Sequence, residues 1–164
     1  MSELTKAQEK LAEALGLAMA AAAATEKVEE RVDHPALVDL LRTMRHEAED
    51  TQRRIVGYAA LLEDGVRWEI HAEAAYVQRK AGEMANAWFK LATDGIQAFQ
   101  FLAMGEAGEV ATWAALVELN RYGDPALDDL CAWAIEIQQR HLKDALAGVV
   151  RLASLPAPEQ ESLA

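Results

Sequence analysis

The chain has little of what would cross-link it, insert it in a membrane or bind it to nucleic acid. Its single cysteine, Cys131, excludes an intrachain disulfide and any CxxC metal site. Its longest alanine run, at 20–24, is too short and too weakly hydrophobic to span a membrane, and the polar N-terminus lacks a signal-peptide core. The chain has a formal net charge of -11 and no basic cluster, so it is a poor candidate for binding nucleic acid or anionic membranes. We expect a soluble, cytoplasmic protein that binds neither nucleic acid nor membrane.

Glycine and proline are also few, and they stand between segments with helical periodicity. The chain has 164 residues, of which 52% are hydrophobic and many are alanine, enough for one domain with a real core. The pattern predicts an all-α protein, an antiparallel four- to five-helix bundle, with one domain over residues 1–155. The C-terminal residues 156–164, which are rich in proline and polar residues, are expected to form a loose tail.

Capping residues, proline and glycine suggest where the helices begin and end. We expect a first helix over about residues 3–31 with Ser2 as its N-cap, and a second that starts at Pro35 and stops at Gly65. Periodicity runs almost unbroken from 66 to 122, which is too long for one helix in a domain of this size. A break at 93–95 is expected, with 105–108 as the alternative. The segment 123–125 ends one helix and caps the last, and the short connections predict antiparallel neighbours.

The buried stripe of the first helix is made of small or apolar residues and carries no acid. Alanines in this stripe either let a neighbouring helix approach closely or leave room for a bulky side chain such as tryptophan. The stripe consists of Leu4, Ala7, Leu11, Ala14, Ala18, Ala21, Thr25, Val28 and Val32.

The functional question centres on a second stripe, in which steps of four and three residues alternate over 99–120. It is apolar except at Glu106, near its middle, and at Asn120, at its end. A carboxylate on the buried face of a helix is costly unless it is paired, protonated or bound to a cation. We therefore predict that Glu106 is buried and has a partner, either His141 or a residue of the second helix. The stripe consists of Phe99, Ala103, Glu106, Val110, Trp113, Val117 and Asn120.

His141 is the second ionisable residue on an inner stripe, and it lies on the last helix. Glu109 and Glu47 flank the inner faces, and Gln138 lies one turn before His141. Carboxylates and a histidine that project into a bundle can bind iron, manganese or zinc. The structural alternative is a buried Glu–His ion pair, which perturbs side chains in much the same way as a metal site.

The aromatic residues and the cysteine have structural interpretations as well as functional ones. Four tryptophans, Trp68, Trp88, Trp113 and Trp133, could line a slot for a small molecule between helices. Trp88 and Trp113 fall on core stripes and are expected to fill volume left by the alanine-rich first helix. Cys131 has no base nearby in the sequence, and we expect a packed thiol.

Two segments suggest a family. The pieces MRHEAEDTQRRI and GEAGEVATWAALVELNRYGDPAL…EIQQRHLKDAL resemble the YciE/YciF-type ferritin-like proteins, small bacterial four- or five-helix bundles linked to stress responses. The likeness covers roughly residues 26–146. It rests on the acidic segment that ends in Thr51, on Glu106, Glu109 and Trp113, and on Glu136 of the last helix. The resemblance implies a ferritin-like fold.

The ligand count argues against a complete di-metal centre. Such a centre draws a glutamate from each of two helices and a Glu-x-x-His pair from each of the other two. Here the candidate metal ligands are Glu47, Glu106, Glu109 and His141, with Gln138 where a glutamate is needed. The leading hypothesis is a ferritin-like bundle, expected to form a homodimer, with a degenerate metal centre and a structural or stress-related binding role. The alternatives are a ferritin-like metalloenzyme of the oxidase type or an iron- or manganese-binding protein that uses those four residues, and a small-molecule carrier with a tryptophan-lined pocket.

Overall fold

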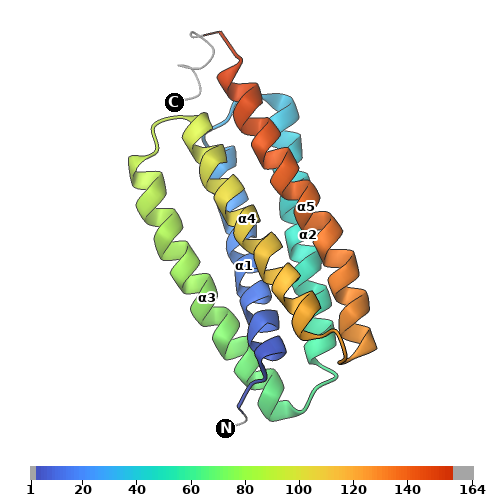
Figure 1. Ribbon diagram of the computed structural model, residues 1–164. Coiled ribbons are helices and arrows are strands. Elements are labelled where there is room, and N and C mark those ends of the chain that lie inside the picture. Colours follow the sequence, from blue (N-terminus) through green and yellow to red (C-terminus); the bar gives the residue numbers. More distant parts are fainter. Residues whose placement is uncertain (1–2, 157–164) are drawn as a thin grey trace.

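The computed structural model describes residues 3–156, and this part of the chain folds into five α-helices without strands (Figure 1). The N-terminal residues 1–2 and most of the expected tail, residues 157–164, lie outside it. No helix in the described part is long and apolar enough to cross a membrane. The helices are α1 (Lys6–Glu29), α2 (Pro35–Ala59), α3 (Asp64–Leu91), α4 (Gly95–Leu119) and α5 (Pro125–Ala153).

Four of the helices form an antiparallel bundle, and the fifth lies outside it. Around the bundle, α1 packs against α2, α2 against α5, α5 against α4, and α4 against α1. The helix α3 carries the chain from the end of α2 back to the start of α4 and packs along α1 (Figure 1). The all-helical bundle expected from periodicity is therefore present, with α3 as a long crossover between two helical hairpins.

The prediction that consecutive helices are neighbours holds for α1 with α2 and for α4 with α5, but it is wrong for α3. That helix has few contacts with α4 and docks on α1 instead. Gly16 of α1 explains how the two approach so closely. A Cβ at this position would lie 2.5 Å from the carbonyl oxygen of Ala74 and 2.7 Å from Cβ of Val77. The position tolerates only glycine, a tertiary requirement that helical periodicity does not show.

The observed helix ends correct two predictions. Thr5, not Ser2, is the N-cap of α1: its hydroxyl accepts from the backbone N–H of Gln8, and its own backbone N–H donates to the Gln8 side-chain oxygen. Ser2 lies outside the described residues. The helix α2 ends at Ala59 rather than at Gly65, which belongs to the first turn of α3. Asp64 in that turn favours a helix start, because a carboxylate is stabilised near the N-terminal end of the helix dipole.

The predicted break at 93–95 is confirmed, and α4 is continuous through Gly105 and Gly108. Asp94 caps α4 by accepting from the backbone N–H of Gln97 at 2.8 Å. Across the same turn, the indole N–H of Trp88 donates to the Gln97 carbonyl at 3.0 Å. The stripe that carries Glu106 is therefore on an unbroken helix.

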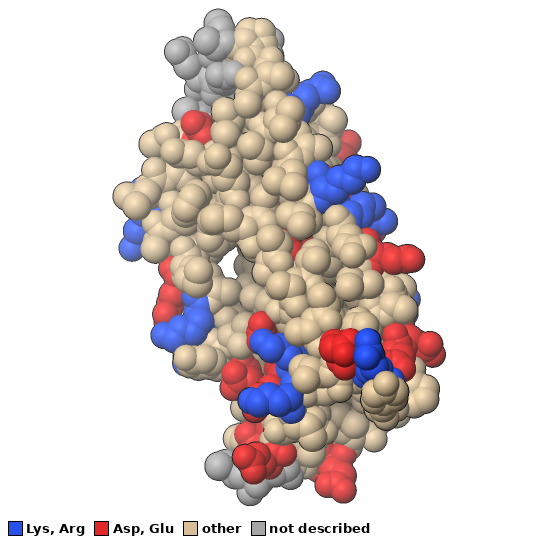
Figure 2. All heavy atoms as spheres, in the orientation of Figure 1, with Lys and Arg blue, Asp and Glu red and all other residues tan. Residues whose placement is uncertain are grey.

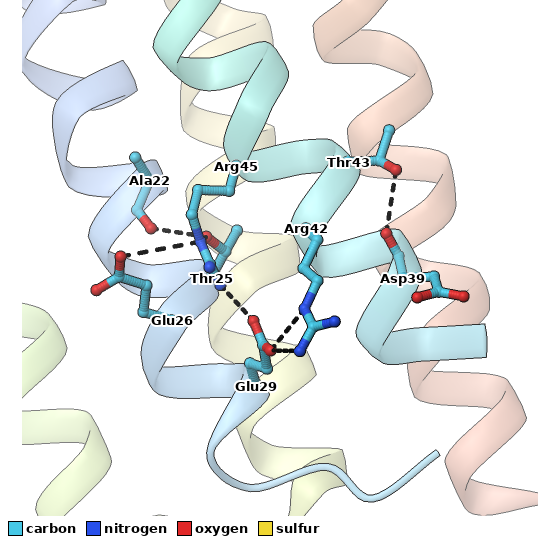
Figure 3. Close-up of polar contacts among 8 residues, drawn as sticks. All are labelled: Ala22, Thr25, Glu26, Glu29, Asp39, Arg42, Thr43 and Arg45. Atoms are coloured by element: carbon cyan, nitrogen blue, oxygen red, sulfur yellow. Dashed lines mark hydrogen bonds and ion pairs between the residues drawn. The ribbon is translucent and has the colours of Figure 1, made fainter. Parts of the chain in front are cut away.

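A polar seam joins α1 to α2 near the Glu29 end of α1 (Figure 3). Glu29 accepts from Arg42 at 2.9 Å and from Arg45 at 2.5 Å. Arg45 also donates to the hydroxyl of Thr25, which itself donates to the Ala22 carbonyl. Hydrogen bonds from Arg45 and Arg42 lower the pKa of Glu29. The Glu29 carboxylate is therefore an ion-pair partner of α2.

The apolar interior consists of two clusters with a polar layer between them. Along α4, one cluster takes Ala98 to Ala103 and the other takes Trp113 and Leu116. Along α5 the order is reversed, as antiparallel packing requires. We define the polar layer as the residues that separate the two clusters on α2, α4 and α5: Glu47, Glu106, Glu109, Gln138 and His141.

Candidate functional site

Glu106 lies inside the bundle, as predicted, with only 2% of its surface exposed. It follows Phe99 and Ala103 and precedes Trp113 on the buried side of α4. The predicted stripe is wrong at Val117, which is 41% exposed. Since α4 is covered by α1 as well as by α5, its buried face is wider than one stripe and takes in Glu109 and Thr112 instead.

His141 lies between two carboxylates that come from different helices. Its Nε2 is 2.6 Å from Oε2 of Glu47 on α2, and its Nδ1 is 3.5 Å from Oε2 of Glu106 on α4. A neutral imidazole has one donor and one acceptor, whereas an ionised carboxylate only accepts. The arrangement is therefore suited to the doubly protonated ring, and the predicted partnership between Glu106 and His141 is confirmed.

The charges around His141 favour its protonated form. Burial disfavours the charged ring, but the hydrogen bonding and negative charge of Glu106, followed by those of Glu47, outweigh it and raise the pKa of His141 above its ordinary 6.5. An imidazolium at this point supplies the positive charge that the facing carboxylates require.

Glu47 has a second cationic partner that the sequence analysis missed. Partial burial favours its neutral form, but hydrogen bonds from His141 and Arg140, with their charges, lower the pKa of Glu47 overall. Arg140 reaches Oε1 of Glu47 at 2.5 Å. Arg140 lies off the apolar stripe of α5, so periodicity gave no sign of it; its place next to His141 in the chain was the only signal.

Glu109 is as buried as Glu106 but has a much weaker partner. The Gln138 amide lies 3.5 Å from its Oε1, Oε2 has no hydrogen-bond partner, and the neighbouring acidic side chain is Glu106. Burial, followed by the negative charge of Glu106, raises the pKa of Glu109 well above its ordinary 4.5. Oε1 of Gln138 likewise lacks a hydrogen-bond partner, and Oε2 of Glu106 has only its 3.5 Å ion-pair contact with Nδ1 of His141. The layer therefore combines a well-paired half at Glu47 with an under-satisfied half at Glu109.

The four predicted metal ligands share one layer, but not in the arrangement of a metal site. In residues 3–156, no group of three or more His, Cys, Asp or Glu side chains is placed to hold a metal ion. His141 occupies the space between Glu47 and Glu106 that a bridging ion would need. Of the acids on α1, Glu29 belongs to the seam with α2 (Figure 3).

One acid of α1 does reach a bundle partner, contrary to the expectation of an acid-free inner face. Half-buried Glu13 accepts a hydrogen bond from the Thr112 hydroxyl of α4 at 2.8 Å and pairs with Lys10. It borders the α1 stripe, next to Ala14, so the stripe alone did not place it inside.

A pocket adjoins the under-satisfied half of the layer. It lies between α1, α3 and α4 and has a volume of about 60 Å³. Its walls are alanine and other apolar side chains, and both Glu106 and Glu109 lie at its edge. No tryptophan lines it, so the idea of a tryptophan-lined slot is wrong for this pocket.

The tryptophans and the cysteine have mainly packing roles. Trp113 is fully buried, Trp88 is half-buried, and Trp68 is 65% exposed. Trp133 lies under the guanidinium of Arg54, 4.1 Å from ring centroid to Cζ. Cys131 is buried, which together with Asp128 raises the pKa of its thiol to about 11. The thiol therefore stays protonated near neutral pH, consistent with a packed thiol rather than a nucleophile.

Comparison with protein-family models, with curated protein sequences and with solved structures gives no match to this chain. What can be said of its class rests on its own geometry: an all-helical bundle with a buried layer of carboxylates around a histidine.

Proposed function

We propose that the chain is a ferritin-like bundle whose metal centre is degenerate, and that it has a binding or structural role rather than an oxidase role. The observation that carries the proposal is the position of His141, which holds one carboxylate with each ring nitrogen. In place of a metal ion, the bundle carries its own cation, an imidazolium, at the point where the carboxylates converge.

The path of the chain supports the ferritin-like class. Two helical hairpins, α1–α2 and α4–α5, are joined by one long crossover, which is the connectivity of ferritin-like bundles. The segments that resemble the YciE/YciF-type proteins supply Glu47, Glu106, Glu109 and His141, and all four fall in the polar layer. A stress-related role is carried over from that resemblance, and a homodimeric state is part of the proposal.

Elemental analysis tests the degenerate centre. We expect protein from cells grown with added iron and manganese to retain well under one metal per chain after dialysis. About two iron or manganese ions per chain would overturn the proposal, since they would require His141 to turn away from both carboxylates.

A second candidate is a single weakly held cation. Three buried oxygens without hydrogen-bond partners favour it, namely Oε2 of Glu106, Oε2 of Glu109 and Oε1 of Gln138, because hard cations prefer oxygen ligands. Titration with Mn²⁺ followed by electron paramagnetic resonance separates the candidates. One saturable Mn²⁺ site that Glu109→Gln abolishes would support the single-cation candidate. An unchanged signal of unbound Mn²⁺ would support the degenerate centre.

A further inference from the structure

The pocket between α1, α3 and α4 combines an apolar wall with a buried acidic end. On α1 it is lined by Leu17, Ala20, Ala21 and Ala24, and on α3 by Ala81 and Ala85. On the α4 side it reaches Glu106 and Glu109, each 2% exposed. Oε2 of Glu109, with no hydrogen-bond partner, belongs to a residue of this lining. Such a group calls for a partner, because an unsatisfied buried polar atom carries its full desolvation penalty.

The pocket has the volume of a small ligand with a short alkyl chain. A water molecule needs about 10–15 Å³ measured in this way, so 60 Å³ holds roughly four to six water-sized groups. The space can be reached from outside, because α3 has few contacts with α4 and Figure 2 shows an opening in the surface between these helices. The small residues of α1 and α3 keep this space open, since larger side chains at the alanine positions would fill it.

The charges around the polar layer lack one cation. Three carboxylates, Glu47, Glu106 and Glu109, face two cations, Arg140 and His141, and both cations contact Glu47 or Glu106 rather than Glu109. The parts of α1 and α3 that line the pocket contribute no titratable group, and from α5 only the Gln138 amide reaches Glu109. Glu109 is therefore the one carboxyl of the layer whose ionised form has no cationic partner, and a cation beside it would supply one.

We propose that this pocket binds a small primary alkylammonium ion, with the ammonium group at Glu109 and the alkyl chain between the alanines of α1 and α3. The assignment rests on the proposed function to the extent that no metal occupies Glu106 and Glu109. A primary ammonium has three donors, of which one would meet Oε2 of Glu109. The alkyl chain removes apolar wall from water, which a hydrated inorganic cation cannot do.

Calorimetric titration with n-butylammonium chloride, a ligand of five heavy atoms, tests the proposal. We expect saturable binding with a dissociation constant on the order of 1 mM, as suits so small a ligand. 1-Butanol, which lacks the charge, and potassium chloride, which lacks the chain, should each bind at least about tenfold more weakly.

Variants identify the site. Glu109→Gln removes the charge and keeps the shape, and Ala21→Leu fills the pocket; each should weaken n-butylammonium binding by about tenfold or more. Ala107→Leu is the matched control, since Ala107 is exposed on α4 and does not line the pocket, and it should bind as the parent does. Thermal melts by circular dichroism establish that each variant is folded.

The outcomes separate this proposal from the proposed function. No saturable binding, equal binding of 1-butanol, or unchanged binding by the folded Ala21→Leu variant would overturn the alkylammonium site and leave the degenerate metal centre standing. Retention of about two metal ions per chain would overturn the degenerate centre itself, whatever the calorimetry shows.

Discussion

At the scale of single residues, the polar layer depends on His141 being charged. If Glu106→Gln removes one of its two carboxylate partners, we expect the pKa of His141 to fall, and the free energy of unfolding to drop by about 1–3 kcal/mol near pH 6. Nuclear magnetic resonance titration of the ring and urea denaturation measure the two effects. Glu118→Gln, at an exposed acid of the same helix, is the control and should change neither. Equal effects of both changes would contradict the role given to Glu106.

Glu109 should behave in the opposite way, because it is a buried acid without a cation. Its raised pKa means that folding disfavours its ionised form, so ionisation destabilises the protein as the pH rises above the ordinary 4.5. We expect Glu109→Gln to be more stable than the parent by about 1 kcal/mol or more near pH 8, with the difference shrinking towards pH 5. Urea denaturation at both pH values measures this. A destabilised variant at pH 8 would show that Glu109 has a partner that the geometry does not reveal.

At the scale of helices, the contact between α1 and α3 depends on Gly16. We expect Gly16→Ala to lower the free energy of unfolding by about 1–3 kcal/mol, because the new methyl group would overlap Ala74 and Val77. Gly108→Ala on α4 is the matched control: nothing lies within 4 Å of its added Cβ, and alanine is the better helix former. The control should be neutral or stabilising by up to about 1 kcal/mol. If the two changes have the same effect on denaturation, α3 does not pack on α1 as described.

The same arrangement makes α3 the least protected of the five helices. It contacts mainly α1 and exposes Trp68, Tyr76 and Met84, which are 65%, 47% and 68% exposed. We expect its amide hydrogens to exchange faster than those of α1 and α4, since helices with few buried contacts open locally. Hydrogen–deuterium exchange followed by mass spectrometry compares the helices directly. Uniform protection across α1, α3 and α4 would contradict this view.

At the scale of the whole molecule, the polar layer sets the pH dependence of stability. The raised pKa values of His141 and Glu109 contribute stability at low pH that is lost as the pH rises through their folded-state values, from about 6.5 and 4.5 upward. The lowered pKa of Glu47 contributes stability above about 4.5 that is lost as the pH falls through its folded-state value. We expect the free energy of unfolding to be greatest near pH 4.5, because Glu109 costs stability above it and Glu47 loses its stabilising charge below it. A maximum above pH 8 in denaturation curves would contradict the charges assigned to the layer.

Much of this architecture could be predicted from the sequence, because local signals determine it. Periodicity predicts most of the buried residues of α2 and α5, but in α4 it predicts only Phe99, Ala103, Glu106 and Trp113. Asp94 and Gly95 mark the break between α3 and α4 correctly. The burial of Glu106 and its pairing with His141 followed from the same logic. The predictions failed where a helix is covered on more than one side: Val117 is exposed and Glu109 is buried because two helices, not one, cover α4.

The sequence by itself determined that the chain is all-helical, where most helices start and stop, and that a carboxylate and a histidine lie inside. These properties follow from periodicity and capping, which act over a few neighbouring residues. Only the tertiary structure decided that α3 docks on α1 rather than α4, that Arg140 pairs with Glu47, and that a pocket opens beside Glu109. Each of these depends on which helices become neighbours across long stretches of chain, and that choice is made by the fit of whole helix surfaces, such as Gly16 against Ala74, rather than by any local pattern.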